Sequence, residues 1–277
     1  MTTDFIAANR ANWDDRAPLH AARDGSGYGV QQFLDDPTAL SEVVRFDMPL
    51  LGDINGLRAV HLQCHIGTDT ISLARLGATV TGLDFSGQSV AEARQLAADS
   101  GDSVTFVESD VRGALQVLPN AAFDLVYTGV GALCWLPNIR EWAGVVAGLL
   151  AQGGSLFIRE AHPILWAMDE SLDDDLHLRF PYFERQEPLE WDDEQSYVPT
   201  VAALTATKTY EWNHSLGEIV TALIEHGLRI DMLVEHESVP WEALPGQMTL
   251  RTDGESALTE RSGVAPLSYT LRATKAA

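Results

Sequence analysis

One carboxylate and one short loop in the first half of the chain have the spacing of a site for a ribose-bearing cofactor. The stretch HLQCHIGTDTISLARLGATVTGLDFS, residues 61–86, holds Gly67 in the loop and ends its second predicted strand at Asp84. A carboxylate there can accept hydrogen bonds from both hydroxyls of a ribose. Small residues in such a loop let the backbone approach a ligand, and the next helix offers free N–H groups. The stretch therefore predicts binding of an adenosine cofactor whose 2′-hydroxyl is free.

The glycine positions help to separate two cofactor classes. The dinucleotide pattern G-x-G-x-x-G would place glycines where the chain has Gln63, His65 and Thr68. The methyltransferase pattern G-x-G-x-G would place them at 63, 65 and 67, where only Gly67 matches. A dinucleotide brings two phosphates against this loop, so bulky side chains disfavour it more than they disfavour S-adenosylmethionine, which has no phosphate. The loop favours the second class only weakly.

Two residues near the middle of the chain are candidates for catalysis. His162 follows the predicted strand 155–160 in REAHP, at the edge of the sheet where a second substrate would lie. A histidine that titrates near neutral pH can remove a proton from an acceptor. Glu160 is a candidate orienting carboxylate. The alternative is structural, with His162 fixing the turn before Pro163.

The elements that must position these residues alternate between strand and helix from residue 58 onward. Ser86 and Asn138 are predicted N-caps, and Ser215 with Glu218 forms a capping box. Strands that alternate with helices predict an open parallel sheet with helices on both faces. We expect strands at 58–63, 78–84, 103–109, 122–128, 155–160, 228–236 and 265–274, and helices at 68–77, 86–101, within 138–154 and at 215–227.

Two segments depart from this alternation. The start of the chain predicts helices at 5–17 and 38–52, separated by a Gly- and Asp-rich loop at 24–37. Residues 169–194 hold 11 acids and two arginines among several aromatic residues, which fits either a cap over a site or a solvated loop. We therefore divide the chain into an N-terminal helical lid at 1–57, a core at 58–160 and 211–277, and an acidic and aromatic insertion at 161–210.

Composition excludes several functional classes. Of the 277 residues, 40 are Asp or Glu and 18 are Lys or Arg, so the formal charge of −22 disfavours binding to a phosphate backbone. Cys64 and Cys134 give no disulfide framework and no zinc pattern. The first residues lack the features of a signal peptide, and no apolar run is long enough to span a membrane. We expect a soluble, cytoplasmic protein.

The stretch at 61–86, together with GALCWLPNI and REAHP, resembles the class I S-adenosylmethionine-dependent methyltransferases. Within them it is similar to an uncharacterised subgroup that has Q-C-H-x-G in place of the glycine-rich turn. The resemblance covers residues 58–160 and returns in the last third of the chain. It implies a Rossmann-like seven-stranded sheet with an antiparallel last strand, and S-adenosylmethionine as cofactor without a required metal.

The resemblance also implies roles for individual residues. The turn beside the methionine and ribose would be formed by Gln63, Cys64, His65 and Gly67. Asp84 would hold the ribose hydroxyls, Phe85 would pack near the adenine, and Asp110, followed by Val111, would bind the adenine amino group. Thr128 and Gly129 would lie near the transferred methyl, and the candidates for the acceptor pocket are Tyr28, Trp135 and His214.

The function that follows is methyl transfer to the oxygen or nitrogen of a small-molecule acceptor. Two other functions stay open on the sequence alone. One is a nicotinamide-dependent oxidoreductase, which the failed glycine positions disfavour. The other is a non-catalytic cofactor-binding or scaffold protein on the same fold, which a pocket closed by Gln63 and His65 would favour.

Overall fold

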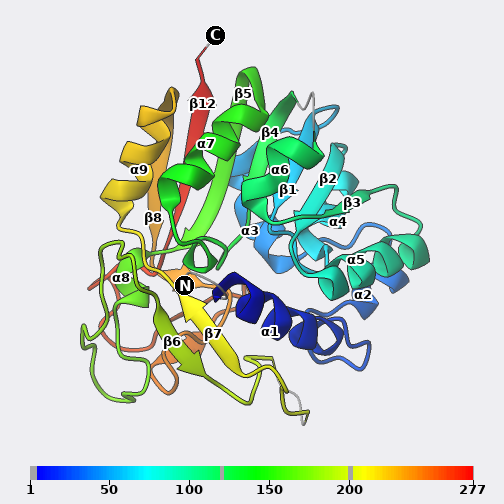
Figure 1. Cartoon of the computed structure of the whole chain (residues 1–277). Coiled ribbons are helices and arrows are strands. Elements are labelled where there is room, and N and C mark those ends of the chain that lie inside the picture. The colour runs from blue at the N-terminus through cyan, green and yellow to red at the C-terminus, as the bar shows by residue number, and fades with distance from the viewer. Residues whose placement is uncertain (1–4, 119–121, 199–201, 277) are drawn as a thin grey trace.

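A seven-stranded sheet runs through the centre of the computed structural model, which describes residues 5–118, 122–198 and 202–276 (Figure 1). Its strand order is β3-β2-β1-β4-β5-β12-β8, and β12 runs antiparallel to both of its neighbours. The predicted Rossmann-like sheet with an antiparallel last strand is confirmed. The strands are β1 (Arg58–Leu62), β2 (Thr79–Asp84), β3 (Thr105–Glu108), β4 (Phe123–Thr128), β5 (Leu150–Ala161), β8 (Leu228–His236) and β12 (Ser268–Lys275).

Helices cover both faces of this sheet because successive strand residues point to opposite sides. Val60 of β1 packs in a cluster with the apolar faces of α7 (Ile139–Leu149) and α9 (Leu216–Glu225). Its neighbour Ala59 packs in the opposite cluster with α3 (Glu42–Leu51) and α4 (Thr68–Arg75). The remaining helical segments of the core are α5 (Gly87–Ser100), η1 (Val111–Gly113), α6 (Ala114–Val117) and η2 (Leu133–Trp135), and the short helix α8 (Pro163–Trp166) follows β5.

The predicted helix caps are formed as expected. The Ser86 side chain accepts a hydrogen bond from the N–H of Ser89, and Asn138 caps α7 in the same way. Ser215 and Glu218 form the reciprocal capping box of α9. These caps satisfy N–H groups that the first helical turn leaves unpaired, so each helix begins at a defined residue.

The N-terminal segment forms α1 (Phe5–His20) and α2 (Gln31–Asp35). The second of these helices lies inside the predicted loop 24–37, where five residues are too few to show a helical period. The buried side of α1 is polar and consists of Asn9, Asn12, Arg16 and His20 together with Ala17. This helix therefore docks through hydrogen bonds more than through an apolar stripe.

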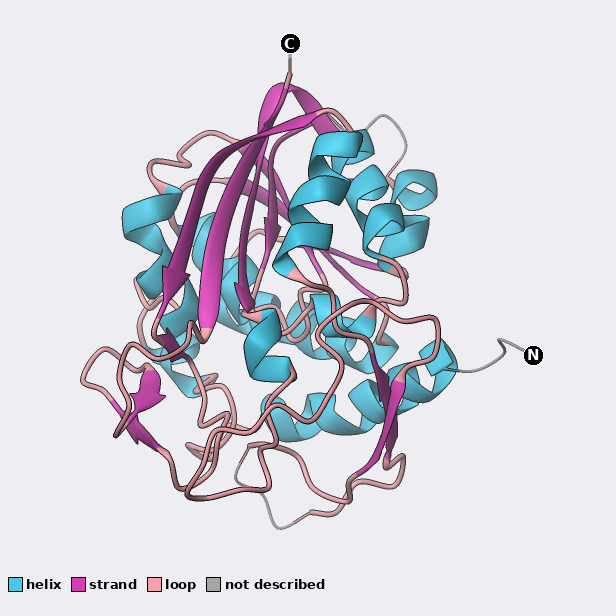
Figure 2. Ribbon diagram, turned by 90° about the vertical axis from the view of Figure 1, so that its left-hand side faces the viewer, coloured by secondary structure: helices cyan, strands magenta, loops and turns pink. Residues whose placement is uncertain are grey.

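Two insertions lie at the end of the sheet toward which the parallel strands point (Figure 2). The first contains the antiparallel pair β6 (Leu189–Asp192) and β7 (Lys208–Glu211), which lies beside α1. The second is a small sheet between β8 and β12 that the sequence analysis did not assign. Its strands are β9 (Ser238–Val239), β10 (Met248–Leu250) and β11 (Ser256–Leu258).

No helix in the described ranges combines the length and apolar character needed to cross a membrane.

Candidate functional site

The loop between β1 and α4 has the backbone of a glycine-rich turn, but only the last of its three glycine positions holds glycine. Gln63, His65 and Gly67 have φ angles of 56°, 49° and 82°. For residues other than glycine this left-handed region costs about 1–2 kcal/mol each. The three positions have the spacing of G-x-G-x-G, whereas Thr68 begins α4. A Cβ at Gly67 would lie 2.8 Å from the Phe106 ring, so packing as well as φ requires glycine there.

Asp84, at the end of β2, holds this loop in place. One carboxylate oxygen accepts a hydrogen bond of 2.8 Å from the His65 N–H, and the other accepts one of 2.9 Å from Ser86. Burial raises the pKa of Asp84 to about 6, although these N–H groups oppose the shift. Each oxygen keeps a second lone pair, which a hydroxyl donor can use. The Cys64 side chain lies in an apolar cluster, so that residue offers a ligand only its backbone.

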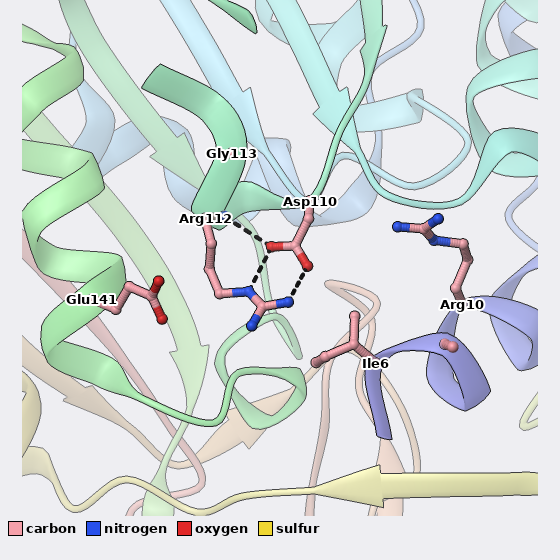
Figure 3. Close-up of a pocket in the computed structure, with 7 residues that line it drawn as sticks. Ile6, Arg10, Asp110, Arg112, Gly113 and Glu141 are labelled. Atoms are coloured by element: carbon pink, nitrogen blue, oxygen red, sulfur yellow. Dashed lines mark hydrogen bonds and ion pairs between the residues drawn. The ribbon is translucent and has the colours of Figure 1, made fainter. Parts of the chain in front are cut away.

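Next along the same edge, Asp110 follows β3 and lies at a cavity of about 540 Å³ (Figure 3). Both of its carboxylate oxygens accept hydrogen bonds from the Arg112 guanidinium, at 2.9 and 2.7 Å. Burial raises the pKa of Asp110, but the bonds from Arg112 outweigh it and hold the pKa below its usual value. Arg10 of α1 lines the opposite wall, with its guanidinium 5.9 Å from the Phe85 ring centroid. Val111, which follows Asp110, is buried in the apolar core.

Two buried polar atoms at the ends of β1 and β4 have no hydrogen-bond partner within the described residues. They are Gln63 Oε1 and Thr128 Oγ1. The amide nitrogen of Gln63 does have a partner, since it donates to the Ala132 carbonyl at 2.7 Å. The ends of the two strands are paired, Leu62 opposite Thr128. Unpaired buried polar atoms of this kind mark a place where a ligand or water completes the bonding.

Aromatic side chains close over the loop from the N-terminal segment. The Trp13 ring lies 4.8 Å from the His65 ring and 5.3 Å from Trp135, centroid to centroid. Tyr28 contacts His65 at 5.5 Å and shares a hydrogen bond with the hydroxyl of Tyr197. Thus Tyr28 and Trp135, predicted for the acceptor pocket, both lie beside the loop, whereas His214 does not belong to this group.

A chain of hydrogen bonds ties the lid to the loop. It runs from Ser89 to His65 at 3.0 Å, from His65 to His20 at 2.7 Å, and from His20 to Ser196 of the insertion at 2.7 Å. Burial lowers the pKa of His20 to about 3 and the pKa of His65 well below its usual value. Both rings are therefore neutral, each with one nitrogen donating and one accepting.

The predicted catalytic candidate Glu160 is occupied by the backbone. Its carboxylate accepts hydrogen bonds from the N–H groups of Gly131, Ala132, Leu133 and Ala161, at 2.6–2.8 Å. Burial raises its pKa and these four donors oppose the shift. Glu160 therefore holds the loop after β4 in place, and its carboxylate has little hydrogen-bonding capacity left for a substrate.

The two predicted histidines also have structural partners. His162 Nδ1 accepts from the Ile164 N–H and Nε2 lies 3.1 Å from Glu235 of β8, which is the turn-fixing alternative considered above. His214 bonds Glu184 through Nδ1 and the Leu136 carbonyl through Nε2, both at 2.8 Å. Both nitrogens of His214 are therefore occupied, whereas His162 Nε2 is buried beside Glu235 without a hydrogen-bond partner among the described residues.

Residues 60–156 match the family model described as a methyltransferase domain. The chain is therefore similar to methyltransferase domains over this range. It is 32% identical over 134 residues to the methyltransferase phqN of Penicillium fellutanum, covering 46% of this chain and 40% of that protein. It is 33% identical over 106 residues to the ubiquinone biosynthesis O-methyltransferase of Photorhabdus laumondii, covering 38% and 43%. The chain thus spans about two fifths of the length of these curated relatives.

Solved structures share the methyltransferase fold over most of the chain. One from Listeria monocytogenes, assigned to the S-adenosylmethionine-dependent methyltransferases, has a TM-score of 0.59 at 17% identity and covers 85% of this chain and 97% of its own. An S-adenosylmethionine-dependent methyltransferase from Mesorhizobium loti has a TM-score of 0.55 at 22% identity, with 87% and 99% covered.

Sequence reasoning missed two charged residues that α1 brings to the methyltransferase domain. Asp14 accepts a hydrogen bond of 2.6 Å from Ser86, next to Asp84, and Arg10 lines the cavity at Asp110. These contacts join positions more than 70 residues apart. The only signal in the sequence is the polar series of α1, in which Asn9, Asn12 and Arg16 recur at helical spacing.

Proposed function

We propose that this protein transfers the methyl group of S-adenosylmethionine to a small-molecule acceptor. The observation that carries the proposal is the loop at 63–67. Its three left-handed residues have the spacing of the methyltransferase turn, and the loop is bonded to Asp84. The unpaired Gln63 Oε1 and Thr128 Oγ1 beside it offer acceptors to the amino-acid part of the cofactor.

In this proposal each strand end contacts one part of the cofactor. Asp84 accepts from the ribose hydroxyls, Phe85 packs on the adenine, and Asp110 with Val111 lies at its amino group. Gln63, His65, Thr128 and Gly129 surround the methionine part. The bound sulfonium supplies an already activated methyl group, so the protein residues mainly align it with the acceptor and exclude water.

The acceptor is proposed to enter beside Tyr28 and Trp135, under the lid. Similar proteins include a ubiquinone biosynthesis O-methyltransferase and a glycopeptide N-methyltransferase, the latter at a TM-score of 0.51 and 19% identity. Both oxygen and nitrogen acceptors are therefore compatible with this domain. The charge of −22 favours a small acceptor over a nucleic acid.

The substitution Asp84→Ala tests the ribose assignment. We expect it to weaken binding of S-adenosylhomocysteine, measured by calorimetry, by about 1.5–3 kcal/mol, the range for hydrogen bonds to a charged group. Asp231→Ala, at an exposed site on β8, is the matched control and should leave affinity unchanged. A folded Asp84→Ala protein with wild-type affinity would show that Asp84 does not hold the ribose.

A further inference from the structure

One buried cation in the lid has no ion-pair partner. Arg16 of α1 is 8% exposed, and its Nε donates to the Asn12 side chain at 2.7 Å. In the part of the chain that the structure describes, no carboxylate oxygen lies within 4.0 Å of its guanidinium. Neither of its two terminal nitrogens has a hydrogen-bond acceptor there.

Two other strongly buried arginines, Arg159 and Arg75, do have carboxylate partners. Arg159 pairs with Glu255 through two hydrogen bonds of 3.1 and 2.6 Å. Arg75 pairs with Asp102 at 2.8 Å and also donates to three backbone carbonyls. Since an uncompensated buried charge is costly, the missing partner of Arg16 calls for a specific explanation.

The surroundings of Arg16 hold its guanidinium beside the loop at 63–67. Its central carbon lies 5.6 Å from the Trp13 ring centroid and 5.5 Å from that of Tyr197. The same Trp13 ring packs on His65 and Trp135.

One acidic group that senses the charge of Arg16 is Glu211 of β7. The charge of Arg16 lowers the pKa of Glu211, but burial and Glu170 raise that pKa to about 7. Glu211 is therefore only partly ionised near neutral pH and compensates Arg16 incompletely.

We propose that Arg16 binds a carboxylate group of a bound molecule. This rests on the proposed function, because the carboxylate belongs either to the methionine part of the cofactor or to the acceptor. A guanidinium with two free terminal nitrogens matches a carboxylate with two parallel hydrogen bonds. The two flanking rings hold that fork in one orientation before the ligand arrives.

The test compares two nucleosides that differ in the carboxylate-bearing part. Wild type, Arg16→Met and Arg16→Lys are titrated calorimetrically with S-adenosylhomocysteine and with 5′-methylthioadenosine, which lacks the amino-acid group. Methionine keeps an apolar stem between Trp13 and Tyr197 without the charge, and unchanged binding of methylthioadenosine shows that the site is folded. Arg45→Ala, which removes a half-exposed arginine on α3, is the charge control.

A second arm tests the acceptor as source of the carboxylate. Benzoate and the neutral benzyl alcohol are titrated as probes, with and without saturating S-adenosylhomocysteine. If the cofactor supplies the carboxylate, Arg16→Met weakens S-adenosylhomocysteine roughly tenfold to hundredfold and leaves methylthioadenosine unchanged. If the acceptor supplies it, Arg16→Met abolishes benzoate binding alone. In either case Arg16→Lys retains part of the affinity.

Two results would overturn the assignment. One is wild-type affinity of Arg16→Met for both S-adenosylhomocysteine and benzoate. The other is an equal loss for both nucleosides, which would make Arg16 a residue that only holds the lid. If wild type binds neither nucleoside, the proposed function fails separately, and the benzoate titration without nucleoside still decides the role of Arg16.

Discussion

Gln63 and His65 adopt a backbone conformation that glycine would adopt without strain. Their side chains compensate for part of that strain, because Gln63 donates to Ala132 and His65 bonds both Ser89 and His20. The chain thus keeps the turn of a glycine-rich loop and gains two side chains that connect it to the loop after β4 and to the lid. Strained residues held by their surroundings in this way are typical of ligand sites.

A matched pair of variants measures that strain. Gln63→Gly and Gln63→Ala both lose the bond to Ala132. Only the alanine variant is also destabilised by the left-handed φ, by about 1–2 kcal/mol. Glycine loses about 0.5–1 kcal/mol more backbone entropy on folding, so we expect Gln63→Gly to be more stable by up to about 1.5 kcal/mol in chemical denaturation. At the exposed helical residue Gln95 the order should reverse. Greater stability of Gln63→Ala than of Gln63→Gly would contradict the left-handed backbone conformation of residue 63.

Among the elements, α1 is joined to the first insertion by side chains. These side chains bond backbone groups of the insertion as a neighbouring strand would. The Asn9 amide donates to the Tyr210 carbonyl and accepts from the Tyr210 N–H, both at 2.7 Å. Asp15 accepts from Thr205 and Ala206 of the same segment. Helix and hairpin therefore form one unit over the strand ends.

Removing the Asn9 amide should loosen this unit and leave the sheet intact. Asn9→Ala leaves two backbone groups of Tyr210 unpaired, which costs about 1–3 kcal/mol. We expect amide hydrogen exchange in α1 and β7 to speed up roughly tenfold to hundredfold, with β1 and β4 unchanged. Gln31→Ala, which removes an exposed amide on α2, is the control and should change neither. Equal acceleration in the sheet, or none in α1, would show that the unit is not formed in this way.

Local signals in the sequence were sufficient for the seven strands and the longer helices of the core, but not for the short segments η1, α6 and η2. Capping residues and the apolar spacing in α7 and α9 predicted helices that the structure contains. The predicted helix within 138–154 ends earlier, because β5 already begins at Leu150. The second insertion was missed since its strands have two or three residues, too few to show an alternating pattern.

For the whole molecule, the seven strands and the antiparallel last strand followed from the family resemblance, whereas the contacts of the N-terminal segment followed from no local pattern. Asp84 ends β2 and Asp110 follows β3, so their position at one edge of the sheet could be predicted. Arg16 and Asp14 reach the site only through the docking of α1, and the polar spacing of that helix does not indicate where it docks. Glu160 and His162 also lie at that edge, but backbone N–H groups occupy the Glu160 carboxylate and the Nδ1 atom of His162.

The most direct test of the central claim is calorimetric titration of the purified protein with S-adenosylmethionine, S-adenosylhomocysteine and NAD in parallel, after any co-purified cofactor has been removed. The turn at 63–67 with Asp84 predicts micromolar binding of the first two and none of NAD. Binding of none of the three would contradict the account, because Gln63 and His65 would then have closed the cofactor site. Binding of NAD alone would contradict it as well, because the turn would then accept a dinucleotide.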